Sequence, residues 1–193
     1  MYTPFQANHF ILKKQMLALT GVFRLYDDSG NVIAYSKQKM FKLREDIRVF
    51  TDENQTHEVL SIQARQILDF AAAYDVYDSQ EQRLVGTLRR RGFRSMLRDE
   101  WDVLHPGDTQ VGTLVEDSMM RAVLRRMLVG RLLPQDYDLL LGSDKVMDLR
   151  QQFNFFRYEL DLDFSYDTNR RLDHRLGIAA GILLAAIEGK QES

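Results

Sequence analysis

Apolar and polar side chains alternate along much of this chain, and the clearest case lies between residues 156 and 165. Polar or charged residues there separate the apolar ones, which are Phe156, Tyr158, Leu160, Leu162 and Phe164. A period of two predicts a β-strand with one buried face. Further stretches with the composition of strands lie at 20–26, 31–36, 46–51, 58–64, 70–77, 83–89, 101–104, 110–115, 136–141 and 145–150.

Turn sequences separate many of these predicted strands: DDSGN at 27–31, TDENQ at 51–55, HPGD at 105–108 and GSDK at 142–145. Asp, Asn, Gly and Pro favour tight turns because each suits backbone angles that strands exclude. Many short strands joined by hairpin turns, with few long helices, predict an antiparallel β-barrel or a β-sandwich.

A different pattern occupies the end of the chain, where LGIAAGILLAAIE covers residues 176–188. No side chain from Leu176 to Ile187 is polar or charged. A helix over these 12 residues is about 18 Å long, whereas a bilayer core is about 30 Å thick. The run therefore predicts a buried core helix rather than a membrane span, and a helix that is apolar all round must be enclosed on every side.

We expect this central helix to cover about 169–188. The preceding sequence, DTNRRLDHRL, offers Asp167, Thr168 or Asn169 as the N-cap, because their side-chain oxygens accept hydrogen bonds from the first free N–H groups of a helix. Asp173 lies too late in the sequence to cap a helix with these bounds.

One further segment, EDSMMRAVLRRMLVG at 116–130, has the period of an amphipathic helix. Asp117 or Ser118 is suited to cap its start, and Gly130 to end it. Its apolar positions recur every three or four residues: Met119, Met120, Val123, Leu124, Met127 and Leu128.

The sequence also contains an internal repeat, with units at 20–66 and 73–116. Tyr26–Asp27 in the first unit corresponds to Tyr77–Asp78 in the second, and a polar turn follows each pair. REDIRVF at 44–50 aligns with RDEWDVL at 98–104, and LSIQAR at 60–65 aligns with VGTLVE at 111–116. A structural repeat of this kind informs on fold rather than on activity.

Composition narrows the class of protein. The chain has 193 residues, of which 45% are hydrophobic and 28% charged, as in ordinary globular domains. We expect one domain over 1–193. The net charge of −2 provides no global attraction for nucleic acid or anionic lipid, so any such attraction must be local. The lack of cysteine excludes thiol catalysis, disulfides and thiolate metal sites. The N-terminus lacks the pattern of a secretory signal, so we expect a cytoplasmic protein.

Several words of the sequence occur in the order typical of one superfamily: KLREDIRVFTDE at 42–53, IQARQILDFAAAYDVYDS at 62–79, VGTLRRRGFRSMLRDEWDVL at 85–104, LDLDFS at 160–165 and the terminal LAAIEG. With these words the chain resembles the Tubby C-terminal-like superfamily, and most closely its phospholipid scramblase-related and LURP-one-related proteins. The resemblance covers the chain from about Phe10 to its end. It implies a mainly β fold, a closed antiparallel β-barrel of about twelve strands wrapped around a central hydrophobic C-terminal α-helix.

The same resemblance implies several functions. Tubby-type members bind phosphoinositide headgroups through surface lysines and arginines, and scramblase-type members are linked to calcium and lipid movement. Enzyme chemistry has no support, because the sequence lacks the G-x-S-x-G, P-loop, G-x-G-x-x-G and H-E-x-x-H motifs. We expect no enzyme activity, no cofactor and no metal. The four histidines are scattered and are interpreted as surface or capping residues: His9, His57, His105 and His174.

Three acids share the polar face of the strand at 156–165: Glu159, Asp161 and Asp163. Calcium prefers several carboxylate oxygens, but a loop must usually fold them around the ion, whereas an extended strand presents them on one side only. We therefore interpret these acids as solvated side chains that face Arg or Lys on a neighbouring strand.

Basic residues gather at equivalent places in the two repeats. The candidate residues for binding a phosphate or headgroup are Arg89, Arg90, Arg91 and Arg94 in the second repeat, and Lys37, Lys39, Lys42 and Arg44 in the first. Arginine suits phosphate because its planar fork donates two hydrogen bonds at once. The alternative is a pair of solvated loops whose cations are partnered by Glu45, Asp46, Asp99 and Glu100.

These observations lead to one leading hypothesis, a non-catalytic binding module for a phosphoinositide or another phosphorylated or anionic lipid headgroup. Such a protein would lie at the periphery of a membrane. The first alternative is a structural barrel that binds an acidic protein partner and no lipid. The second is a scramblase-like lipid transporter, which requires the terminal helix to lie in the bilayer. No nucleic-acid partner is expected.

Overall fold

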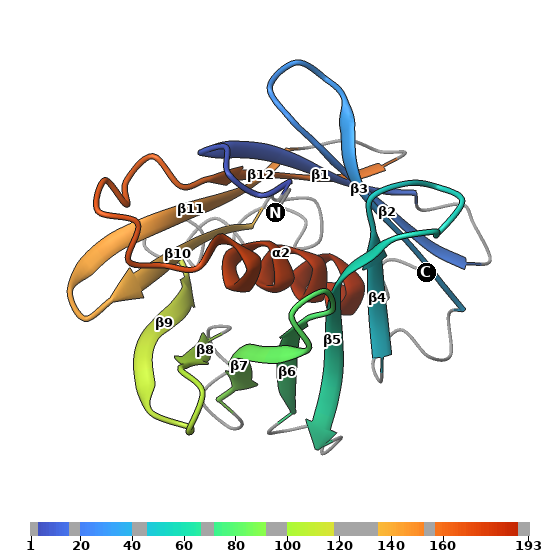
Figure 1. The fold of residues 1–193 in the computed structure, drawn as a ribbon. Helices are drawn as coiled ribbons and strands as arrows, with labels where there is room; N and C mark the ends of the chain where they lie inside the picture. The colour runs from blue at the N-terminus through green and yellow to red at the C-terminus, as the bar shows by residue number, and fades with distance from the viewer. Residues whose placement is uncertain are drawn as a thin grey trace.

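The computed structural model describes residues 4–15, 20–39, 46–66, 72–91, 100–117, 135–152 and 157–188. Within these ranges, twelve antiparallel strands close into a barrel and one helix, α2, crosses its interior (Figure 1). The strands are β1 His9–Gln15, β2 Thr20–Tyr26, β3 Val32–Lys39, β4 Asp46–Phe50, β5 Glu58–Gln66, β6 Ala73–Asp78, β7 Arg83–Arg90, β8 Glu100–Leu104, β9 Gln110–Glu116, β10 Asp136–Leu141, β11 Asp144–Gln152 and β12 Arg157–Asp163, and the helix is α2 His174–Glu188.

Each strand pairs with its neighbours in the sequence, and β1 pairs with β12 to close the barrel. The closing pair is in register from His9 opposite Asp163 to Gln15 opposite Arg157. This arrangement confirms the predicted barrel and excludes the sandwich, because a sandwich has two sheets. The repeat segments 20–66 and 73–116 coincide with β2–β5 and β6–β9.

Strands with odd numbers run in one direction and strands with even numbers in the other, since all neighbours are antiparallel. The two ends of the barrel are therefore distinct. We call the end where β12 finishes and α2 begins the entry end. The opposite end, where the odd-numbered strands finish, is the exit end. The position of Lys14, at the end of β1 and 2.7 Å from the carbonyl oxygen of Ala185, shows that α2 ends there.

The strands form because their alternating apolar residues face inward and cover the helix on all sides. From Ile178 to Ala186 every helical residue other than Gly181 is at most 2% exposed. Gly177 and Gly181 mark where the wall approaches closely. A Cβ atom on Gly177 would lie 2.5 Å from Cε1 of Phe164, and one on Gly181 would lie 2.9 Å from Cδ2 of Leu162. The apolar run is thus the core of the barrel, as the sequence predicted.

The start of the helix differs from the prediction. α2 begins at His174, not near residue 169, and Asp173 is its N-cap, because an Asp173 carboxylate oxygen accepts a hydrogen bond from the Arg175 N–H at 3.0 Å. Asp167 instead organises the preceding turn and accepts a bond from the Leu172 N–H at 2.7 Å. Arg170 has φ of 50°, which a helix does not allow. The prediction of Asp167, Thr168 or Asn169 as the N-cap was therefore wrong.

Strand β1 was missed by the alternation pattern, whereas each predicted strand corresponds to one of β2–β12. In HFILKKQ, the inward positions are Phe10, Leu12 and Lys14, and Ile11 faces outward. A lysine on the buried face and an isoleucine on the other hide the period of two. The exception has a local cause, since Lys14 Nζ donates its hydrogen bond to the end of α2.

Two further predictions concern single segments. The amphipathic helix expected at 116–130 lies outside the described residues except for 116–117, and Glu116 is the last residue of β9. His174, interpreted as a surface or capping residue, is buried and only 9% exposed. Its ring stacks on Phe164 with 4.1 Å between ring centroids, which the sequence alone does not reveal.

The two ends of α2 are attached to the barrel wall by charged side chains. At the entry end, Arg175 donates a hydrogen bond to Asp78 at the end of β6, and both side chains are largely buried. Such a buried pair fixes the rotation and depth of the helix, because loss of Arg175 leaves the buried charge of Asp78 without its cation. Across the described ranges, no helix is both long and apolar enough to cross a membrane.

Candidate functional site

The candidate basic residues that the structure describes lie at the exit end of the barrel, on two strands, β3 and β7, that are separated by β4, β5 and β6. Lys37 lies near the end of β3 and is exposed, while Arg89 and Arg90 end β7 and Arg91 follows it. Both strands carry odd numbers and finish at the same end. Lys39 is the last residue of β3, but its side chain lies outside the described part. The remaining candidates lie outside the described residues: Lys42, Arg44 and Arg94.

Register between β7 and β8 determines how the arginines are held. Arg89 lies opposite Asp102, and Arg90 lies opposite Trp101. Side chains alternate along a strand, so Arg90 shares the inward face of β7 with the core residue Leu88, whereas Arg89 faces outward. The Arg90 guanidinium carbon lies 5.9 Å from the Trp101 ring centroid, a cation–π distance.

Asp102 bridges two arginines on the outer face. One carboxylate oxygen accepts a hydrogen bond from Arg89 Nη2 at 2.9 Å, and the other accepts one from Arg91 Nε at 2.5 Å. Arg91 also donates to Glu100. The side chain of Asp102 is 8% exposed, so its charge is held by these two cations rather than by water. The sequence indicated Glu100 as a partner but did not indicate Asp102.

These ion pairs reduce the positive charge of the cluster. Arg89 and Arg91 share the charges of Glu100 and Asp102, and Lys37 adds an exposed cation at the same end of the barrel. The Arg89 side chain is nevertheless 47% exposed. Because Arg89 donates to Asp102 through Nε and Nη2, its Nη1 amino group stays available as a donor. The arrangement presents an anchored, accessible arginine.

A family model described as LURP-one-related matches residues 8–184. The chain belongs to the LURP-one-related family. This family is part of the Tubby-like superfamily, and the barrel closed around α2 is the fold that the resemblance implied. Neither the curated proteins nor the solved structures contain a match to this chain.

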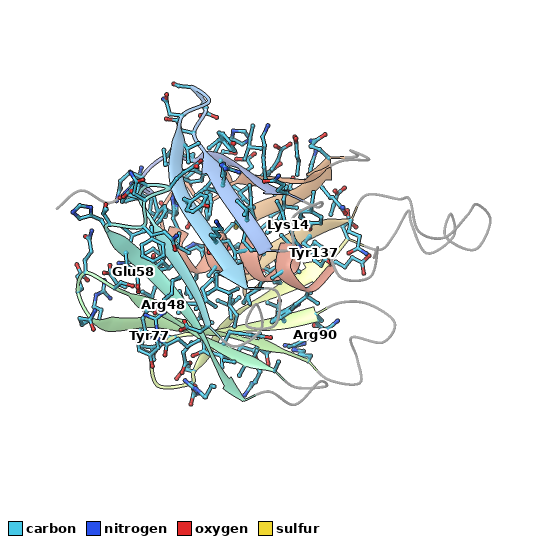
Figure 2. All side chains as sticks on the ribbon, turned by 90° about the vertical axis from the view of Figure 1, so that its right-hand side faces the viewer. Lys14, Arg48, Glu58, Tyr77, Arg90 and Tyr137 are labelled. Atoms are coloured by element: carbon cyan, nitrogen blue, oxygen red, sulfur yellow. The ribbon has the colours of Figure 1, made fainter. Side chains whose placement is uncertain are left out.

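The LURP-one-related barrel also carries polar groups inside its exit end. Figure 2 shows Lys14, Arg90 and Tyr137 toward one end of the barrel. Lys14 is 5% exposed, and its Nζ lies 5.8 Å from the Phe23 ring centroid as well as on the Ala185 carbonyl oxygen. Tyr137 donates through its hydroxyl to Gln135 at 2.7 Å. Lys14 is the residue that sequence reasoning missed here, because β1 was not predicted.

The acids of β12 contact side chains on both neighbouring strands of this family member. Glu159 lies 3.6 Å from Lys13 Nζ of β1, and Asp161 accepts a hydrogen bond from Gln152 of β11 at 2.5 Å. Asp163 accepts a bond from the Ser165 N–H. Among the residues that the structure describes, no three acids or histidines are grouped so that they could hold a metal ion.

Proposed function

We propose that this LURP-one-related barrel is a non-catalytic binding module for a phosphorylated, anionic lipid headgroup, which it binds at the exit end. One observation carries the proposal. Lys37 on β3 and Arg89 on β7 are exposed basic side chains from the two halves of the sequence repeat, and both strands finish at this end. A phosphate group needs several convergent donors, and Arg supplies them in a fixed fork.

The ion pairs at Asp102 support binding rather than oppose it. A long basic side chain loses conformational entropy when a ligand immobilises it, and anchoring it beforehand reduces that cost. Arg89 is already held against Asp102 and remains 47% exposed. Its free Nη1 group can therefore donate to a phosphate oxygen without a rearrangement of the wall.

The proposed site consists of Lys37, Arg89, Arg90 and Arg91, and the sequence adds Lys39, Lys42, Arg44 and Arg94 as further candidates. A headgroup ligand implies a peripheral position at the cytoplasmic face of a membrane. The transporter alternative requires α2 in the bilayer, whereas α2 lies inside the barrel with its apolar residues buried. An acidic protein partner is the competing occupant of the same basic surface.

Vesicle sedimentation tests the proposal. Vesicles of phosphatidylcholine alone are compared with vesicles that also contain phosphatidylinositol bisphosphate. We expect binding only to the second kind, at about 0.1 M salt, and loss of binding at about 0.5 M, since added ions screen exposed charges. The double variant Lys37→Gln/Arg89→Gln should bind about 10- to 30-fold more weakly, because each surface cation contributes about 1 kcal/mol near an anionic membrane.

A matched control removes the same charge from the other end. Arg24 of β2 pairs with Glu53 in the turn between β4 and β5, and Arg171 pairs with Asp144 at the start of β11, both toward the entry end. Arg24→Gln/Arg171→Gln should bind the vesicles as the parent does. Equal losses in the two double variants would show a general charge effect and overturn the site. Absence of vesicle binding by the parent would overturn the lipid proposal and favour a protein partner.

A further inference from the structure

A pocket of about 280 Å³ lies at the entry end, opposite the basic site proposed above. Three separate segments form it: the stretch before β1, the turn from β6 to β7 with the start of β7, and the residues that lead into α2. Its charged and polar lining includes Glu81, Arg83, Arg170, Asp173, His174 and Arg175. Phe5 and Leu172 give it an apolar part. The volume suits a small molecule rather than a folded partner.

Arg170 is the cation of this pocket that lacks a carboxylate. Its guanidinium donates to the side-chain oxygen of Gln6 at 2.9 Å and to the Gln6 carbonyl oxygen at 3.3 Å. Within the described part of the chain, no acid forms an ion pair with Arg170. Its contacts are neutral acceptors, so its charge is not balanced there.

The two acids of the pocket are already engaged. Asp173 accepts a hydrogen bond from Arg175 Nη2 at 2.5 Å, and Glu81 accepts one from Arg83. Burial alone would raise the pKa of Asp173, but the bond and charge of Arg175 outweigh it, so this pKa lies below its usual value. Arg175 also pairs with the buried Asp78, so the guanidinium groups of Arg83 and Arg175 are occupied by carboxylates, whereas that of Arg170 contacts only neutral acceptors.

His174 adds a second polar group that faces the pocket. Its Nδ1 lies 3.0 Å from the Phe5 carbonyl oxygen, which only accepts hydrogen bonds, so Nδ1 carries the proton. Its Nε2 has no hydrogen-bond partner among the described residues, and it is not among their fully buried unpartnered atoms. The residue is 9% exposed and lines the pocket, so the open edge of its ring includes Nε2.

We propose that this pocket binds a small organic oxyanion, either a carboxylate or a phosphate monoester, that carries a short apolar group. Arg170 supplies the fork that two anionic oxygens require. His174 Nε2 supplies a second contact, and Phe5 and Leu172 contact the apolar group. The site is independent of the headgroup site, because it lies at the other end of the barrel.

Binding is expected to take up a proton at His174. Burial lowers the pKa of His174 from 6.5, the Phe5 carbonyl opposes this, and the nearby charge of Arg170 lowers it further, while Asp173 and Asp167 raise it. A neutral Nε2 only accepts a hydrogen bond, whereas a protonated one donates to the anion. The anion therefore favours the protonated ring, and affinity rises as the pH falls, by up to about tenfold per pH unit.

Titration of the full chain with benzoate, phenyl phosphate and neutral benzamide tests this proposal, with the imidazole resonances of His174 as the readout. We expect benzoate or phenyl phosphate to bind with a dissociation constant of about 0.1–1 mM at a pH of about 6, and more weakly at about 8. Preference between the two identifies the carboxylate or the phosphate as the favoured group. Benzamide should leave the resonances unchanged.

Variants locate the binding site. Arg170→Gln should weaken binding about tenfold or more, whereas Arg171→Gln, next to it but paired with exposed Asp144, should not change it. Arg83→Gln should also weaken binding and leaves the Gln6 contact intact, so it remains informative if Arg170→Gln disturbs the fold. His174→Gln should remove the pH dependence. Equal binding of benzamide, or no response of His174 to either anion, would overturn the proposal.

Discussion

Lys14 Nζ donates a hydrogen bond to the Ala185 carbonyl oxygen at 2.7 Å, so the barrel wall caps the helix that it encloses. The last carbonyl groups of a helix have no partner within it and carry partial negative charge, and a lysine satisfies both needs. At the entry end, the pair of Arg175 and Asp78 attaches the other end of the helix. The apolar middle of α2 stabilises the fold by burial, and the contacts at its two ends fix where the helix lies in the barrel.

Replacement of Lys14 by Met tests this contact. Met retains the apolar stem but leaves the buried Ala185 carbonyl without this donor, so we expect a loss of about 1.5–3 kcal/mol in the free energy of unfolding. Lys13, its neighbour on the outer face, is the control, because its contact with Glu159 is partly exposed and 3.6 Å long. Lys13→Met should cost about 1 kcal/mol or less. Urea denaturation measures both, and equal stability of Lys14→Met and the parent would contradict the capping role.

The two glycines of α2 should differ in their tolerance of alanine. A Cβ on Gly177 would overlap the Phe164 ring and the Met147 sulfur, at 2.5 and 2.6 Å, whereas a Cβ on Gly181 would meet one Leu162 methyl group at 2.9 Å. Gly177→Ala should therefore cost about 1–3 kcal/mol through overpacking. At Gly181 the gain in helix propensity, about 1 kcal/mol, offsets the smaller clash. Thermal unfolding compares the two variants, and the reverse order of stability would contradict the packing described.

His174 should make the stability of the fold depend on pH. Burial lowers its folded pKa below the value of 6.5 expected for the unfolded chain. The stabilisation is therefore fully present above about pH 6.5 and is lost as the pH falls toward the folded pKa, because only the unfolded chain takes up the proton. Urea unfolding between about pH 7.5 and 5.5 measures the slope. His174→Gln should reduce this pH dependence, and His105→Gln, at an exposed turn, should not. Identical slopes for both variants would contradict the role given to His174.

Much of the fold was predictable because its pattern is local. Alternation located β2–β12, and the length of the apolar run at 176–187 identified a core helix. β1 was not predicted because Lys14 occupies an inward position, where it donates a hydrogen bond to the Ala185 carbonyl oxygen. The two residues are 171 positions apart in the sequence, so no local pattern reveals the contact. The N-cap was predicted at the wrong residues because Arg170 adopts a φ of 50°, which a helix does not allow, so the helix begins only after Asp173.

The candidate sites depend more strongly on contacts across strands. Composition located the arginines of β7, but the register that places Arg89 opposite Asp102 follows only from the paired strands. The entry-end pocket brings together Phe5, Arg83 and His174, which no pattern of spacing connects. Long-range assembly of this kind becomes visible only when the barrel closes.

Both proposed binding sites depend on the enclosed position of α2. If the helix lay in a bilayer instead, the contacts that hold both ends of the barrel in place would be lost. Hydrogen–deuterium exchange of the amides from Ile178 to Ala186 measures the enclosed position most directly. We expect these amides to exchange only through global unfolding, with the opening free energy found by urea denaturation, and to remain protected when vesicles are added. Exchange at a much lower opening free energy, or a loss of protection on addition of vesicles, would contradict the enclosed helix.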